Sequence, residues 1–304
     1  MPRARKHLVC IDTTPYYHVV SRCVRRAFLC GEDRVSGKSF EHRRGWIEDR
    51  VRLLSSTFCV DIAAYAIMSN HYHLVVKLVP QRASNWSDDE VLDRWAALYR
   101  GPLLMQRHRD GETLSAAEQD SLASMAKVFR QRLTSLSWFM KCLNEPIARQ
   151  ANREDGCTGH FWEARFHSQA LTSDRALIAA MAYVDLNPVR AGIAGTPEGS
   201  EFTSLRARLD KAAPDTRRKQ RPNRPLLPFA DETGPESLPV RRQDYLELVD
   251  IAGRAARRGA VGRISPGLQP ILERLGLSQQ EWLASATRFK HAIRRGDLQT
   301  AKSA

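Results

Sequence analysis

The segment Ile67-Met-Ser-Asn-His71-Tyr72-His73-Leu-Val-Val-Lys77 carries two histidines, separated by one residue, at the head of an apolar run with β-branched side chains. Alternate side chains of a strand leave the same face, so the spacing predicts that His71 and His73 project side by side while Tyr72 points the other way. Such a pair of imidazoles can bind a metal ion, or it can be a packed or hydrogen-bonded pair. As ligands, two imidazoles suit zinc, copper or manganese without selecting among them.

The neighbouring segments predict an α+β fold that contains an antiparallel sheet. Residues 16–22 are β-branched and aromatic, which is typical of a strand. Over residues 39–58, apolar side chains recur mostly at three- and four-residue intervals, which predicts an amphipathic helix. The apolar run 59–68, the turn-like pair Ser69-Asn70 and the run 71–79 predict a hairpin. Strand, helix and hairpin in this order begin a layered α+β fold.

Residues 80–124 interrupt this pattern and are interpreted as a helical insertion between core elements. Ser87, followed three residues later by Glu90, predicts a capping box at the start of a helix. Breaks at Gly101-Pro102 and Asp110-Gly111 frame two short helices. The sequence assigns no role to this insertion.

One continuous amphipathic helix is predicted after the insertion, and Pro146 is expected to kink it or end it early. Its apolar stripe steps by 4, 3, 4, 3 and 4 residues through Phe129, Leu133, Leu136, Met140, Leu143 and Ile147. Its reverse face carries Lys127, Arg130, Arg132 and Lys141. A solvated face is the simple interpretation of these basic residues, and contact with DNA is the alternative.

A second chemically distinctive segment follows a predicted strand over residues 168–172. Ser173-Asp174 predicts the start of a helix over 176–187 that stops at Pro188. Tyr183 and Asn187 are four residues apart and therefore share a face of this helix. Tyr183 can equally be a packed helix tyrosine, and Asn187 a helix C-cap, which does not exclude a ligand role.

The C-terminal third differs in composition from the rest of the chain. Residues 212–238 are rich in proline and basic side chains, which predicts an extended or disordered linker that touches phosphates. Residues 239–304 predict a small basic helical region with short helices over 242–256, 268–275 and 278–293. The expected division is therefore a domain over 1–211, the linker, and this helical region.

The chain is strongly basic, with 47 Lys and Arg against 34 Asp and Glu, a formal net charge of +13 over 304 residues. This balance favours a polyanionic partner such as nucleic acid, although a basic surface without such a partner has the same composition. The six cysteines include no Cys-x-x-Cys pair, so we expect reduced thiols and neither a disulfide framework nor a zinc knuckle. No stretch approaches the roughly 20 apolar residues of a membrane span, and the first apolar run is too short for a signal peptide. We expect no membrane contact and a cytoplasmic, nucleoid-associated protein.

Four blocks, in this order, make the chain similar to the REP-associated tyrosine transposases (RAYTs), which are single-tyrosine HUH transposases. The blocks are Tyr17-His-Val-Val-Ser-Arg22, Met68-Ser-Asn-His-Tyr-His-Leu-Val-Val76, Gly159-His-Phe-Trp-Glu-Ala-Arg-Phe166 and Tyr183-Val-Asp-Leu-Asn-Pro-Val-Arg-Ala-Gly-Ile193. The resemblance covers roughly residues 16–209, and the last of the four blocks is long and unusual. Tyr72 fills the middle position of the His-hydrophobic-His motif, and residues 80–124 are longer than the family core requires.

The resemblance implies a ferredoxin-like (RRM-like) core and a divalent ion, Mg2+ or Mn2+, held by His71, His73 and Asn187. The ion would polarise a scissile phosphate of single-stranded DNA beside a hairpin. Tyr183 would attack as the nucleophile and give a 5′-phosphotyrosine link with a free 3′-OH, which a later strand can attack. Whether the protein acts as a monomer or a homodimer stays open.

Five arginines are candidate DNA contacts: Arg22, Arg25, Arg26, Arg165 and Arg190. Solvated basic loops, or an ion pair in the case of Arg165, explain them equally well. His18, His160 and His167 are interpreted as packing or hydrogen-bonding residues and not as ligands.

Two other functions remain open at this level. One is a replication-initiator or relaxase-like HUH nickase, against which the block Asn187-Pro-Val-Arg-Ala-Gly192 speaks. The other is a non-catalytic, hairpin-binding regulator with a decayed site, against which the intact His71, His73 and Tyr183 speak.

Overall fold

The computed structural model describes residues 9–24, 29–33, 37–210, 226–234, 236–255 and 261–275. Its strands are β1 Tyr16–Arg22, β2 Val60–Ile67, β3 His71–Leu78 and β4 His167–Ala170. They form one four-stranded antiparallel sheet with the order β2-β3-β1-β4. This order, with a helix between β1 and β2 and further helices between β3 and β4, is the ferredoxin-like arrangement. The predicted α+β class, the first strand and the hairpin are confirmed.

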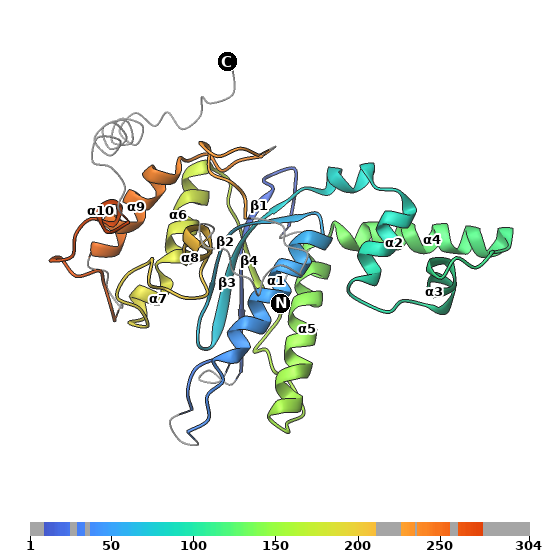
Figure 1. Ribbon diagram of the computed structural model, residues 1–304, viewed down its shortest axis with the longest axis horizontal. Coiled ribbons are helices and arrows are strands. Elements are labelled where there is room, and N and C mark those ends of the chain that lie inside the picture. Colours follow the sequence, from blue (N-terminus) through green and yellow to red (C-terminus); the bar gives the residue numbers. More distant parts are fainter. Residues whose placement is uncertain are drawn as a thin grey trace, which may run out of the picture.

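The helices surround this sheet in three groups (Figure 1). In chain order they are α1 His42–Thr57, the 3-10 helix η2 Pro80–Asn85, α2 Asp88–Ala96, α3 Leu103–Arg109, α4 Ala116–Leu133, α5 Leu136–Glu154, α6 Asp174–Asp185, α7 Asn187–Arg190, α8 Ser204–Leu209, α9 Arg242–Arg254 and α10 Ile271–Arg274. Helices α1 and α5 cover one face of the sheet, α6 and α8 cover the other, and α9 packs against α6. Helices α2, α3 and α4 extend to one side, away from α6 (Figure 1).

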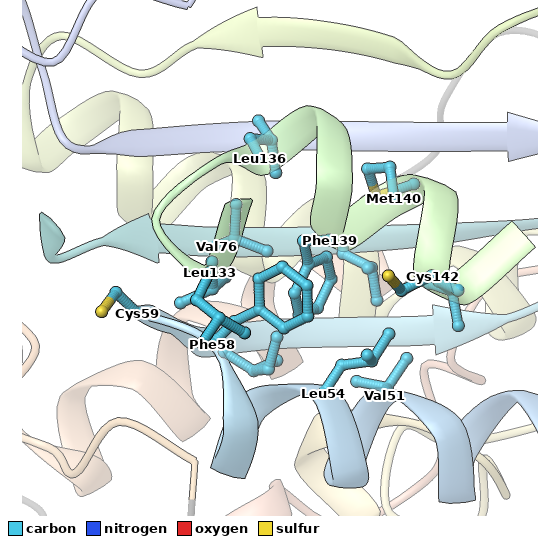
Figure 2. Close-up of a cluster of buried hydrophobic side chains, with 14 of the residues drawn as sticks. Val51, Leu54, Phe58, Cys59, Val76, Leu133, Leu136, Phe139, Met140 and Cys142 are labelled. Atoms are coloured by element: carbon cyan, nitrogen blue, oxygen red, sulfur yellow. The ribbon is translucent and has the colours of Figure 1, made fainter. Parts of the chain in front are cut away.

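The core on the first face is a layer of aliphatic and aromatic side chains between β3, α1 and α5. Figure 2 shows Leu54 of α1 and Phe58, the residue after α1, clustered with Phe139 of α5 and Val76 of β3. The rings of Phe58 and Phe139 pack edge to face, with centroids 5.5 Å apart. Apolar burial of this kind is what fixes both helices on the sheet.

The stripe predicted as one helix over 129–147 belongs to two helices, so the prediction of a continuous helix is wrong. Its apolar residues are all buried in the same core, as expected. The chain breaks between α4 and α5, where Ser135 is extended and its hydroxyl accepts from the backbone N–H of Trp138. At the break the carbonyl of Leu133 accepts from the N–H of Cys59, 2.9 Å away, which ties the junction to β2. Residue 124, taken as the end of the insertion, lies inside α4.

Pro146 does not end α5, which continues to Glu154. A proline inside a helix leaves the carbonyl four residues earlier without its usual donor. That carbonyl belongs to Cys142, and it accepts a hydrogen bond from Nε of Arg50 on α1 at 2.9 Å. A side chain from a neighbouring helix thus supplies the missing donor.

The basic residues on the outer face of α4 and α5 hold the insertion in place. Arg130 donates to the carbonyl of Trp86 and to the carboxylate of Asp88, at 2.8 and 2.7 Å. The guanidinium of Arg132 lies 4.3 Å from the ring centre of Trp138. Arg130 and Arg132 therefore make contacts within the protein and are not simply solvated, as the simple interpretation had it.

The opposite face of the sheet is lined by small side chains where α6 crosses it. Ala63, Ala64 and Ala66 of β2 are fully buried and share a core with Met181 of α6. Because alanine is short, the helix can approach the strand backbone closely. This close approach brings the end of α6 over β3.

The described part of the predicted linker is not a tether. Leu227, Phe229 and Leu238 are buried in the core beneath α6, and the N–H of Leu227 donates to the carbonyl of Ile62 at 2.9 Å. The expectation of an extended linker is wrong for 226–234 and 236–238, because its apolar side chains pack on the sheet. Residues 212–225 lie outside the described residues.

The predicted helix over 242–256 is confirmed as α9, and the one over 268–275 is shorter, as α10. The helix predicted over 278–293 lies outside the described residues. No helix in the described ranges is long and apolar enough to cross a membrane.

Candidate metal and nucleophile site

The two histidines of β3 lie side by side on the sheet face that α6 covers. Their ring centroids are 4.8 Å apart and the rings are nearly perpendicular. Tyr72 points to the opposite face, where it is fully buried and donates to the side chain of Asn144. Strand periodicity therefore places all three side chains as predicted.

The hydrogen bonds of the two imidazoles assign the same tautomer to both rings. Nδ1 of His71 contacts the amide oxygen of Asn70, which can only accept, so Nδ1 carries the hydrogen. Nε2 of His73 lies 3.0 Å from Nδ2 of Asn187, which can only donate, so this Nε2 carries the lone pair. Both rings thus have the tautomer with hydrogen on Nδ1 and a lone pair on Nε2.

Tyr183 and Asn187 both reach His73, although they do not belong to one continuous helix. Helix α6 ends at Asp185, and Asn187 begins the short helix α7 that contains Pro188. The prediction of a single helix through 187 is therefore wrong by two residues. The Tyr183 ring lies edge-on to His73 with centroids 5.6 Å apart. The two side chains converge on one imidazole within a single chain.

The imidazoles of the site are neutral at neutral pH. Burial, and secondarily the charge of Arg22, lowers the pKa of His71 to about 4. Burial, with the neighbouring His71, His18 and Arg22, lowers the pKa of His73 to about 2. The pKa of His18 is also lowered, chiefly by burial. Neutral rings offer lone pairs for coordination, so the site is chemically prepared to act as a ligand set.

His18 is a member of the site that the sequence analysis did not assign to it. Its Nε2 lies 3.0 Å from Nδ1 of His73, and the two rings stack with centroids 5.1 Å apart. Because Nδ1 of His73 carries the hydrogen, His18 is the acceptor. The first sequence block already placed His18 on the same strand face as Arg22, but only the pairing of β1 with β3 shows that it reaches His73.

The candidate DNA contacts have different positions. Arg22 is exposed and lies directly opposite His71 in the β1–β3 register. The guanidinium of Arg190 lies 5.9 Å from the ring centre of Tyr183. Arg165 is exposed just before β4. Arg25 and Arg26 lie outside the described residues.

The donor set that these residues form is two imidazoles and one carboxamide. Among the described residues, no three or more His, Cys, Asp or Glu side chains are grouped so that they could hold a metal ion. Two neutral imidazoles with parallel tautomers and an adjacent amide fit a divalent ion that keeps coordination positions open for other oxygens. Imidazoles are poor ligands for Mg2+. The set of two imidazoles and one carboxamide therefore fits a transition-metal ion such as Mn2+ better.

Comparisons with known proteins found no matching family model and no matching curated protein. Among solved structures, the chain is similar to one described as a REP-associated tyrosine transposase bound to a REP hairpin. The likeness has a TM-score of 0.40 at 13% sequence identity, and it covers 70% of this chain and 87% of that chain.

Proposed function

We propose that this protein is a metal-dependent endonuclease and strand transferase for single-stranded DNA at hairpins, with Tyr183 as nucleophile. The observation that carries the proposal is the convergence of Tyr183 and Asn187 on His73, beside His71, within one chain. A phenol can act as a nucleophile, and two neutral imidazoles with an amide can hold an ion that polarises a phosphate, so this set of groups suits transesterification of a phosphodiester. The net charge of +13 fits a polyanionic substrate.

His71, His73 and Asn187 would hold the divalent ion, Mn2+ or Mg2+. When bound, the ion supplies Lewis-acid polarisation of the scissile phosphate and stabilises the charge that develops there. Rotation of the Asn187 amide about its last torsion presents the oxygen in place of the nitrogen that now faces His73. His71 and His73 keep their Nε2 lone pairs directed to the site because Asn70 and His18 occupy the other nitrogens.

Tyr183 performs the covalent step. Its phenolic oxygen attacks the phosphorus, the bond from phosphorus to the 3′ oxygen breaks, and the phenolic proton is released while the 3′ oxygen gains one. The products are a 5′-phosphotyrosine and a free 3′-OH, and attack by a 3′-OH on this link rejoins DNA without an external energy source. The Arg190 guanidinium lies 5.9 Å from the centre of the Tyr183 ring, next to the reacting groups.

The hairpin is included in the proposed substrate because the four sequence blocks resemble those of the REP-associated tyrosine transposases. Arg22 and Arg190 are the proposed phosphate contacts next to the site. Both adjoin the reacting groups, since Arg22 faces His71 across the β1–β3 pair and Arg190 lies over Tyr183. Contacts to phosphates position the strand and carry no sequence information.

The proposal is tested by incubating the protein with hairpin oligonucleotides and Mn2+ or Mg2+ and looking for a covalent protein–DNA adduct. We expect the adduct with the wild type and none with Tyr183→Phe. Tyr16→Phe is the matched control, because Tyr16 lies on the same sheet face and contacts Lys77 instead. An adduct that persists in Tyr183→Phe would assign the nucleophile elsewhere. Hairpin binding without any adduct in the wild type would leave a non-catalytic DNA-binding protein.

A further inference from the structure

The described residues beyond 226 pack directly against the corner of the chain that carries Tyr183 and Asn187. We propose that this C-terminal segment is a brace that positions the α6–α7 corner, with Tyr245 and Gly262 as its positioning residues. The proposal rests on the proposed function for its consequence, which is the alignment of Tyr183 and Asn187 with His73. Its structural content stands on three separate sets of contacts.

The first set holds the end of α6 through Asp185, which lies between Tyr183 and Asn187 in the sequence and is fully buried. Its Oδ1 accepts from the hydroxyl of Ser204 at 2.6 Å and from the N–H of Leu205 at 3.0 Å. Its Oδ2 accepts from the hydroxyl of Tyr245 on α9, which is also fully buried. A buried carboxyl group needs such partners, so α9 completes the anchorage of the last residue of α6.

The second set is the close approach of two glycines to the corner. A methyl group on Gly262 would overlap the backbone carbonyl oxygen of Val189 in α7, so only glycine allows the segment to lie this close there. A methyl group on Gly253 of α9 would meet the side-chain ends of Ile264 and, at 2.8 Å, of Leu186 at the α6–α7 junction. The backbone contact at Gly262 is therefore the stricter of the two.

The third set consists of backbone hydrogen bonds from the same segment to α7. The carbonyl of Arg190 accepts from the N–H of Val261 at 2.9 Å and from the N–H of Gly262 at 3.1 Å. The N–H of Ile264 donates to the carbonyl of Gly253 at 3.0 Å and connects this segment back to α9. The segment therefore holds the last residue of α7 through backbone hydrogen bonds.

Helix α7 needs such support because it is a single turn. It spans Asn187–Arg190, and one turn does not form a stable helix on its own. The position of Asn187 relative to His73 is thus set by what packs on α7. In Figure 1, α9 and α10 lie on the same side of the sheet as α6 and α7, and α9 packs against α6.

The test is Gly262→Ala in the full chain, with Gly267→Ala as the matched control. Gly267 has no atom within 4 Å of an added methyl group. For Gly262→Ala we expect amide hydrogen exchange at Ala191, Gly192 and Ile193 to be at least 10-fold faster, and Mn2+ affinity to fall at least 10-fold. Gly267→Ala should match the wild type in both.

Tyr245→Phe is the second variant, in case Gly262→Ala does not fold. It keeps the ring and removes only the hydroxyl that Asp185 accepts from. We expect it to fold, to bind Mn2+ at least 5-fold more weakly, and to bind hairpin DNA like the wild type. If a folded variant has a lower Tm but unchanged exchange in α7 and unchanged Mn2+ affinity, the segment only stabilises the fold and the brace is wrong.

The exchange measurement separates this proposal from the proposed function, because it needs neither metal nor activity. If the wild type neither binds Mn2+ nor cleaves hairpin DNA, the proposed function fails, and the exchange rates in α7 alone decide whether the brace exists.

Discussion

Replacing His18 by leucine should weaken metal binding at His73 without unfolding the protein. His18 Nε2 accepts the hydrogen bond that fixes the tautomer of His73, at 3.0 Å. The His73 ring is 4% exposed, so without His18 its Nδ1–H is left buried without an acceptor. An unsatisfied buried donor costs about 1–3 kcal/mol. Loss of the hydrogen-bond partner of a ligating histidine typically lowers metal affinity about 10- to 100-fold.

A factor of 10 to 100 in affinity corresponds to about 1.4–2.7 kcal/mol, and the unsatisfied donor separately lowers the stability of the folded protein. The assay is titration with Mn2+ followed by the electron paramagnetic resonance signal of the free ion. His18→Gln should recover part of the affinity, because its amide oxygen can accept. His167→Leu is the control, since His167 is exposed on the neighbouring β4 and lies opposite Val20.

The result that refutes this reasoning is a His18→Leu protein that binds Mn2+ within twofold of the wild type. Equal losses in His18→Leu and His167→Leu would assign the effect to the general polarity of this sheet face. A thermal melt of each variant separates loss of metal binding from loss of fold.

Three further predictions follow from the core, from a buried acid and from the donor set. Phe139→Ala removes a fully buried ring from the layer of Figure 2 and should cost about 3–5 kcal/mol in urea unfolding, whereas a loss below 1 kcal/mol would mean that the site repacks. Burial, and secondarily Asp244, raises the pKa of Glu247 to about 7, so ionisation favours the unfolded chain and the Tm should fall between pH 5 and 8. Glu247→Gln should remove this component, and an unchanged pH profile would contradict it. Chelation by EDTA should abolish adduct formation but not hairpin binding, with recovery on adding Mn2+; cleavage that survives EDTA would contradict a metal-dependent reaction.

Strand periodicity was enough to place the histidine pair and Tyr72 on opposite faces, because a β-strand alternates regardless of what surrounds it. Local composition located β1, and two apolar runs around the turn-like pair Ser69-Asn70 located the hairpin. N-caps were also readable where a serine hydroxyl meets a backbone N–H three residues on, as Ser87 and Ser173 do at the starts of α2 and α6. These features depend on interactions within a few residues.

The continuity of the long helix was not readable, because the apolar step of three and four continues across the break at Ser135. What ends α4 is an interaction with Cys59, about seventy positions earlier in the chain. Pro146 is tolerated for the same kind of reason, since its missing donor is replaced by Arg50. The linker composition was misleading because a few apolar residues such as Phe229 gain more from burial than the prolines around them cost.

The sequence by itself determined the sheet, the pairing of His71 with His73, and the type of side chain available for chemistry. The tertiary structure decided which of those side chains meet. His18 reaches His73 only through strand pairing, and Tyr183 and Asn187 reach it through the packing of α6 on β2 and β3. Local sequence fixes the face on which a side chain lies, whereas contacts between distant segments require the packed core that brings those segments together.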